Sequence, residues 1–326
     1  MKEARKNKEK AGKVSEVGRK WLSEEAYDLK RASIVKYEDI LRCYINPTLG
    51  ETELSDISNE QLVSFVNMLK SEGGSGGQPL SESTIAEAVS IMNRLRIYAM
   101  RNDCKILYST ECISLRKAQP DIRVFSIEEE NRLIEYCHKN LEPVTLGILV
   151  ALYTGLRIGE VCALLWSDIN LIDNALRVSK TMYRLRSETS ASSKTVISIS
   201  EPKSKCSKRV IPIPVTLADI LKPFYAPSAY LLTGECNQFV EPRTMQNRFK
   251  KILIECDIAD ANFHATRHTF ATRCVELGFD IKSLSAILRH SNVAFTMNRY
   301  VHPTMALKAE NMNKLCGLFD GLGMEA

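Results

Sequence analysis

The residue types best suited to chemistry on a phosphate ester lie between positions 264 and 302. This stretch holds four of the five histidines of the 326-residue chain. His264 and Arg267 are one helical turn apart and so share a helix face, and Tyr300 follows His290 near the end of the stretch. A tyrosine hydroxyl, with a pKa of about 10, needs a base or a positive charge nearby before it attacks. The preceding Arg and His residues could supply both, which indicates a phosphate site.

An arginine far upstream completes a known pattern. Arg157 follows a Thr-Gly turn signal in the segment ALYTGLRIGEVCALLWSDI, residues 151–169. The chain resembles the tyrosine recombinases of the phage-integrase family, whose signature runs Arg, Lys, His-x-x-Arg, His or Trp, and Tyr. The matching positions are Arg157, Lys203, His264, Arg267, His290 and Tyr300. The motif segments span roughly the C-terminal half, whereas the earlier residues resemble the family's DNA-binding domain only in size and helical pattern.

The resemblance implies a covalent mechanism. Tyr300 would attack phosphorus, form a 3′-phosphotyrosyl bond and release a 5′-hydroxyl. Arg157 and Arg267 would clamp the phosphate, because a guanidinium fork matches two oxygens and stays protonated. His264 would accept a proton or donate to the phosphate, and His290 would donate to it. The linkage keeps the bond energy, so rejoining is expected to need no ATP and, in this family, no metal or other cofactor.

The acid that protonates the leaving 5′ oxygen is expected on the turn PKSKCSKR. Family position selects Lys203, while Lys205 and Lys208 on the same turn remain alternatives. Glu160, one turn after Arg157, is expected to hold that arginine in place.

Two further positions near the signature need a separate interpretation. The family often has Leu-Gly before its second His, but this chain has Arg289 there, which indicates a different backbone or an added phosphate contact. His264 and His268 have the spacing of two zinc ligands, yet Ala265 stands where a zincin has Glu and no third ligand is evident. No metal site is therefore predicted, and His268 is interpreted as a packing residue behind the site.

Composition limits the class of protein. A net charge of +5 permits a nucleic-acid partner without requiring one. Basic residues crowd the first twenty positions, where they form either a solvated terminus or a phosphate clamp. The ten cysteines include no C-x-x-C pair, which favours free thiols in a reducing cytoplasm. We expect no signal peptide, no membrane span and a cytoplasmic location.

The predicted fold is mainly α-helical with one small antiparallel sheet in the catalytic domain. Residues 1–15 are expected to be disordered, 16–104 to form a helical DNA-binding domain, 105–123 a linker and 124–326 the catalytic domain with a C-terminal helix. Periodicity predicts four helices in the first domain, at 17–29, at 33–44 ending before Pro47, from Ser58, and at 82–102.

The catalytic domain is expected to begin with a capping box of Ser126 and Glu129. A buried helix at 144–153 should end at Gly155, and a further helix should run over 158–166. Alternating residues at 175–185 and 194–200 predict a hairpin, and the stretch around 209–215 predicts a third strand. Helices are expected again near Thr216, Pro242 and His264.

The expected partner is double-stranded DNA, held mostly through backbone phosphates by a two-domain clamp. Candidate DNA contacts are Lys180, Arg184, Arg186, Arg243, Gln246, Asn247, Arg248 and Lys250. The resemblance also implies a tetramer on two duplexes, joined through the amphipathic segment 305–322, with accessory DNA-bending proteins as further partners.

The sequence thus predicts a site-specific recombinase that integrates or excises a mobile element. A Xer-like resolvase is the first alternative, since no large extra DNA-binding domain is evident. A non-catalytic DNA-binding regulator, a type IB-like relaxing enzyme and a metallo-hydrolase stay open as rivals from other classes.

Overall fold

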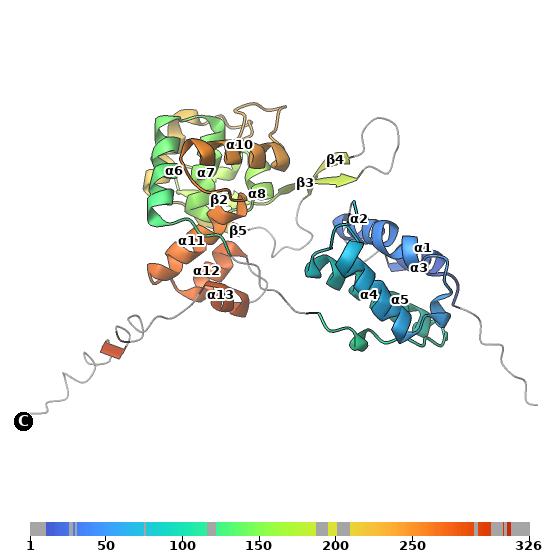
Figure 1. The fold of residues 1–326 in the computed structure, drawn as a ribbon. Helices are drawn as coiled ribbons and strands as arrows, with labels where there is room; N and C mark the ends of the chain where they lie inside the picture. The colour runs from blue at the N-terminus through green and yellow to red at the C-terminus, as the bar shows by residue number, and fades with distance from the viewer. Residues whose placement is uncertain are drawn as a thin grey trace, which may run out of the picture. The chain divides into compact units, whose positions relative to one another are not determined.

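The computed structural model describes residues 11–25, 29, 31–74, 76–115, 122–186, 195–200, 209–289, 293–300, 309 and 312–313. The chain divides into two compact units, Met1–Pro120 and Asp121–Ala326 (Figure 1). Both are mainly helical and the second adds small antiparallel strands, as predicted. Among the described helices, none combines the length and the apolar character that crossing a bilayer requires.

The first unit is a helical bundle. Its helices are α1 (Val14–Glu25), α2 (Arg31–Ile40), α3 (Asn46–Leu49), α4 (Asn59–Glu72) and α5 (Glu82–Arg101). Their apolar faces meet around the buried side chains of Trp21, Phe65 and Met92. Ser58 caps α4 in a capping box with Gln61, which satisfies two backbone donors at the helix start.

Two predictions for this unit were wrong. Residues 11–15 are ordered, because Lys13 pairs with Glu53 in a β-bridge and Val14 is fully buried as the first residue of α1. Residues 1–10 lie outside the described part of the chain. The helix that was expected to end before Pro47 continues through a π-helical turn into α3. Pro47 is the second residue of α3, directly after the π-helical turn, so the proline lies within the helical run instead of ending it.

The segment expected to be a linker, 105–123, is packed in its first half. Tyr108 is 1% exposed, and its hydroxyl donates to the Met92 carbonyl at 2.8 Å. Arg96 Nε donates to the Tyr108 carbonyl at 3.0 Å, and the Ser109 amide donates to Asn59 Oδ1 at 2.7 Å. Residues 105–115 are therefore a part of the first unit that lacks helical periodicity.

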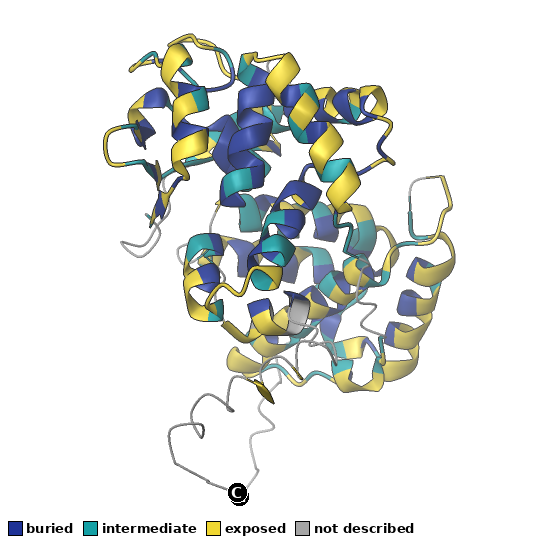
Figure 2. Ribbon diagram, turned by 90° about the vertical axis from the view of Figure 1, so that its left-hand side faces the viewer, coloured by how far each residue is buried: buried dark blue, intermediate teal, exposed yellow. Residues whose placement is uncertain are grey.

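The second unit is built around one buried helix. Its helices are α6 (Ile127–Lys139), α7 (Pro143–Thr154), α8 (Ile158–Cys162), α9 (Val215–Leu221), α10 (Pro242–Glu255), α11 (His264–Glu276), α12 (Ile281–Leu288) and α13 (Val293–Tyr300). Helix α7 is apolar on all sides and contacts α6, α8, α9, α10 and α11, which bury it. The surrounding helices turn one buried face inward and one exposed face outward (Figure 2).

The strands form two sheets, where one was predicted. Strands β1 (Ile169–Asn170), β2 (Ala175–Val178) and β5 (Arg209–Pro212) make an antiparallel sheet in the order β1-β2-β5. Strands β3 (Thr181–Arg186) and β4 (Thr195–Ser200) make the expected hairpin as a separate sheet. The single long strand expected over 175–185 is thus broken between Val178 and Thr181. Helix α8 also ends earlier than predicted, at Cys162.

Candidate active site

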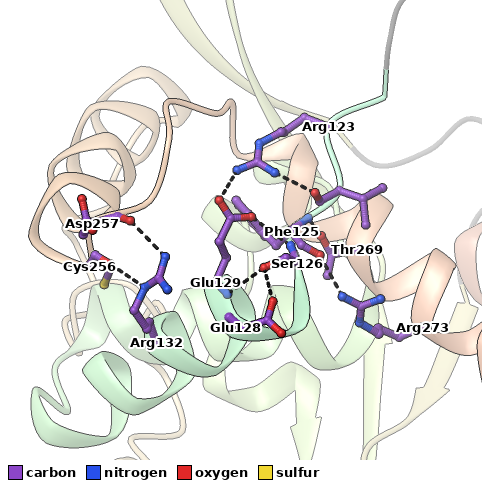
Figure 3. A network of polar contacts seen from close by, with 11 residues as sticks. Arg123, Phe125, Ser126, Glu128, Glu129, Arg132, Cys256, Asp257, Thr269 and Arg273 are labelled. Atoms are coloured by element: carbon purple, nitrogen blue, oxygen red, sulfur yellow. Dashed lines mark hydrogen bonds and ion pairs between the residues drawn. The ribbon is translucent and has the colours of Figure 1, made fainter.

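Helix α11 carries three of the predicted site residues and is anchored from its opposite side. Thr269 Oγ1 accepts a hydrogen bond from the Phe125 amide at 2.9 Å, and Arg273 donates to the Phe125 carbonyl at 2.8 Å (Figure 3). Arg273 Nε also donates to Glu130 of α6 at 2.8 Å. At 100° per residue, Thr269 and Arg273 face away from His264, Arg267 and His268. Binding the far face to the start of α6 therefore fixes the direction of the site face.

The start of α11 is held by a residue predicted to read DNA bases. Gln246 of α10 accepts the Phe263 amide hydrogen at 2.8 Å, directly before His264. Since that amide begins the helix, Gln246 orients α11 rather than projecting freely from α10.

Arg267 lies at the centre of the site and joins three helices. It is 1% exposed and donates to the Gly155 carbonyl at 2.6 Å and to the Leu288 carbonyl. Gly155 ends α7 in the left-handed conformation, as predicted, and Leu288 ends α12. Both acceptors are neutral, so they orient the guanidinium without cancelling its charge. Burial, and next the charge of Arg157, lower the pKa of Arg267 to about 9.

One buried carboxylate, Glu160, interacts electrostatically with Arg267 and binds two further arginines. Glu160 is 6% exposed and accepts from the Arg157 amide at 3.0 Å and from the Arg157 guanidinium at 3.3 Å. Arg209 binds both Glu160 oxygens, at 3.0 and 2.9 Å. Burial alone would raise the pKa of Glu160, but the hydrogen bonds and charge of Arg209, aided by Arg157, lower that pKa to about 2. Glu160 thus contacts Arg157, the arginine that it is expected to hold in place.

Arg209 is a site residue that sequence reasoning missed. Its side chain is 9% exposed, and its Nε is buried without an acceptor among the described residues. Strand alternation places it on the same side of β5 as the buried Ile211. An inward-facing arginine needs a carboxylate, and that requirement could have pointed to Glu160.

Tyr300 ends α13 with a buried ring, and its hydroxyl contacts a histidine. The Tyr300 oxygen lies 2.7 Å from His268 Nδ1, and the two rings are 5.8 Å apart. His264, which is exposed, stacks edge-on against His268 at 4.6 Å between ring centroids. Helices α11, α12 and α13 contact one another, which holds the tyrosine against α11 (Figure 1). His268 therefore contacts the candidate nucleophile itself, beyond the packing role expected of it.

The structure brings together Arg157, Arg267, His264 and Tyr300. Lys203, its alternatives Lys205 and Lys208, and His290 lie outside the described residues. Most of the segment 305–322, predicted to dock on a neighbour, also lies outside them.

Arg289 has the backbone conformation that glycine favours at a helix end. It caps α12 with φ 53° and ψ 55°, in the left-handed region. The backbone at Arg289 is therefore one that a glycine would adopt without strain, and the expected phosphate contact of Arg289 stays a prediction.

The candidate DNA contacts differ in how they are engaged. Arg184 forms an ion pair with Glu241 and donates to Thr195 Oγ1 at 2.9 Å, and Lys250 pairs with Asp260 at 2.8 Å. Lys180 is half-buried at the start of β3. The exposed candidates are Arg186 on the hairpin and Arg243, Asn247 and Arg248 on α10.

Within the described ranges, no three His, Cys, Asp or Glu side chains lie together as ligands of one ion. Of the pair His264 and His268, the second contacts Tyr300 and the first lies edge-on against the second.

Comparison with known proteins identifies the family. Residues 123–306 match the model of the phage integrase family, and residues 13–70 match the model of the phage integrase N-terminal SAM-like domain. The chain belongs to the phage integrase family. It is a tyrosine-type site-specific DNA recombinase, and its fold is the two-domain fold of that family.

The recombinase is similar to several named proteins. It is 30% identical to a XerC-like tyrosine recombinase of Caldanaerobacter subterraneus, over 89% of this chain and 79% of the relative. It is 27% identical to transposase A of transposon Tn554 from Staphylococcus aureus, over 60% of this chain and 53% of the relative. Among solved structures, the Tn1549 transposon integrase in complex with circular intermediate DNA matches with a TM-score of 0.76 at 20% identity, over 93% of this chain and 99% of that one. A lambda integrase tetramer bound to a Holliday junction matches with a TM-score of 0.66 at 14% identity, over 90% and 79% of the two chains.

Proposed function

We propose that this recombinase cuts and rejoins DNA through a covalent bond between Tyr300 and a 3′-phosphate, and that it integrates or excises a mobile element. One observation carries the chemical part of the proposal. The Tyr300 hydroxyl is buried at the end of α13, within hydrogen-bonding distance of His268 and in the electrostatic range of Arg267. A positive environment with an adjacent base is what a tyrosine needs to attack phosphorus at neutral pH.

The arginines act on the phosphate. Arg267 is a cation held in a low-dielectric site, where an anion interacts with it more strongly than in water. Arg157 adds a second guanidinium, so the two non-bridging oxygens and the charge that grows on them in the pentavalent transition state are both stabilised. His264 and His290 donate further hydrogen bonds, and Lys203 protonates the leaving 5′ oxygen.

The helical unit and the catalytic unit together bind one duplex, chiefly through backbone phosphates. The exposed cations of α10 and of the β3–β4 hairpin supply part of that contact. The active assembly is a tetramer on two duplexes, and accessory DNA-bending proteins shape it. The solved lambda integrase tetramer on a Holliday junction supports this assembly by analogy of fold.

Two relatives bear on the biological role. Similarity to transposase A of Tn554 supports a mobile element. Similarity to a XerC-like recombinase supports the alternative, a resolvase that separates joined replicons, because the chain matches most of that relative's length. The chemistry is the same in both, and the arrangement of the DNA sites decides between them.

The covalent mechanism is tested with a nicked suicide DNA that carries the element's junction sequence. The reaction contains EDTA and is resolved on a denaturing gel. Wild type should give a slow protein–DNA band, and Tyr300→Phe should give none. Tight binding without a band would indicate a non-catalytic regulator, and a band that EDTA removes would indicate a metal-dependent enzyme.

The role is tested with plasmids that carry the junction sequences. A mobile-element integrase should join two separate molecules and excise the segment between directly repeated ends. Activity confined to repeats within one molecule would favour the resolvase, and relaxation of plasmids without any site would favour a relaxing enzyme.

The assembly is tested by light scattering with Tyr300→Phe, which binds DNA without cutting it. Paired sites should give a complex with the mass of four protein chains and two duplexes. Complexes of one chain per site under all conditions would contradict the tetramer.

A further inference from the structure

We propose that His268 is the base that accepts the hydroxyl proton of Tyr300 during strand cleavage. This inference rests on the proposed function, since it concerns the same attack on phosphorus. It assigns a catalytic role to a position that the six-residue signature of the family leaves out.

The geometry selects His268 among the histidines of the described chain. Its Nδ1 lies 2.7 Å from the Tyr300 oxygen, which is a hydrogen-bonding distance. A candidate base must reach the proton that it removes, and this ring already does so. His264 is exposed at the first position of α11, and its ring lies edge-on against His268.

Both side chains of the contact between His268 and Tyr300 are buried. His268 is 9% exposed and Tyr300 is 7% exposed, so little water competes for the shared proton. The ring of His268 is held between His264 and Tyr300, on a helix whose far face is bound to α6. A base fixed in this way needs little reorganisation when the hydroxyl attacks.

The charge of Arg267 favours movement of the hydroxyl proton from Tyr300 to His268. The positively charged group nearest to the pair on the same helix is Arg267, and its charge interacts with Tyr300. A cation next to the phenol favours the phenolate over the phenol. The buried carboxylate Glu160, whose two oxygens are bound by Arg209, moderates this field.

The step balances in atoms and charge. The Tyr300 oxygen forms a bond to phosphorus, and its proton moves to His268 Nδ1. The bond between phosphorus and the 5′ oxygen breaks, and that oxygen takes a proton from the general acid. In the rejoining step the 5′-hydroxyl attacks phosphorus and returns its proton to the group that served as general acid, and the tyrosine oxygen leaves and recovers its own proton from His268.

The test measures single-turnover cleavage of the suicide DNA by His268→Ala. Loss of a positioned base should slow cleavage by about 100-fold or more. Added imidazole should restore part of the rate through the space left by the ring. Across substituted imidazoles held as free bases, the rescued rate should rise with the pKa of the imidazole. A purely structural role would give a rescue independent of pKa, or none.

Two further experiments distinguish a proton-accepting role of His268 from its other possible roles. His268→Gln keeps a hydrogen-bonding partner for Tyr300 but cannot take its proton, so it should be as slow as His268→Ala. A cleavage rate near that of wild type in His268→Gln would overturn the inference. DNA with a 5′-bridging sulfur has a leaving group that needs no proton, so both variants should remain slow on it. Full recovery on this DNA would assign His268 to the acid side and would also overturn the inference.

Two control variants show whether a failure concerns the role of His268 or the covalent mechanism through Tyr300. His138→Ala replaces an exposed histidine in the last turn of α6 and should cleave as wild type does. Tyr300→Phe must abolish the adduct; if it does not, the proposed function fails whatever His268 does. Normal cleavage through Tyr300, combined with unaffected His268 variants, would refute only the inference. Circular dichroism on each variant confirms that α11 still folds.

Discussion

Glu160→Gln should destabilise the catalytic unit by about 3 kcal/mol at pH 7. In the folded protein the pKa of Glu160 is about 2, against an ordinary value of 4.5. That difference corresponds to about 3 kcal/mol at neutral pH, and the near-complete burial of Glu160 means that solvent screening removes little of it. The estimate agrees with a cost of about 3–5 kcal/mol for breaking a buried ion pair, since Arg209 would stay buried with its charge uncompensated.

The pH dependence gives the stricter test. The folded pKa of Glu160 is the lower one, so the stabilisation is complete above pH 4.5 and is lost as the pH falls towards 2. The difference between wild type and Glu160→Gln should therefore shrink, from about 3 kcal/mol at pH 7 to about 2 kcal/mol at pH 3.5.

The assay is urea unfolding followed by tryptophan fluorescence. The chain has two tryptophans, one in each unit, so a Trp21→Phe background leaves Trp166 to report on the catalytic unit. Glu135→Gln is the matched control, because it removes an exposed pair with Lys139 and should leave the free energy of unfolding almost unchanged. A loss below about 1 kcal/mol in Glu160→Gln, or a difference that stays constant with pH, would refute the argument.

Four further substitutions have defined outcomes. Gly159→Ala should destabilise the catalytic unit by about 2 kcal/mol or more in urea unfolding, because an added Cβ would lie 2.4 Å from the Met182 carbonyl oxygen. Arg289→Gly should raise the free energy of unfolding by about 1 kcal/mol, since glycine adopts a φ of 53° without strain; a loss of stability would show that the Arg289 side chain matters more than its backbone. Arg243→Ala and Arg248→Ala should each weaken binding to all DNA sequences alike and lower the slope of log K against log salt by about 1; an unchanged slope would remove these residues from the interface.

Elements whose signals are local could be predicted from the sequence. Ser126 and Glu129 form the predicted capping box, since both partners lie within one turn of the chain. The buried α7 follows from an unbroken apolar run, and Gly155 ends it because a left-handed residue is needed there. The six matched positions order the site along the chain, but they say nothing of distances in space.

Features that depend on distant partners could not be predicted. The break between β2 and β3 arises because β2 pairs with β5, some thirty residues later, and β3 pairs with β4. Alternation continues across the break, so periodicity alone gives no sign of it. The contact between His268 and Tyr300 joins two helices through the packing of α12, and only the folded arrangement shows it.

Several of the described site residues lie at the ends of helices. Arg157 precedes α8, His264 begins α11, and Tyr300 ends α13. Helix ends carry unsatisfied backbone groups, and here Arg267 satisfies two of them, the terminal carbonyls of Gly155 and Leu288.

The hydrogen bonds that cap α7 and α12 therefore also orient the guanidinium of Arg267. A change at either helix end should alter catalysis before it unfolds the protein. Substitutions that shift Leu288 without touching the site, such as Ile287→Ala beside it, should lower the cleavage rate more than they lower DNA affinity. An equal loss of both would show that the carbonyl contacts only stabilise the fold.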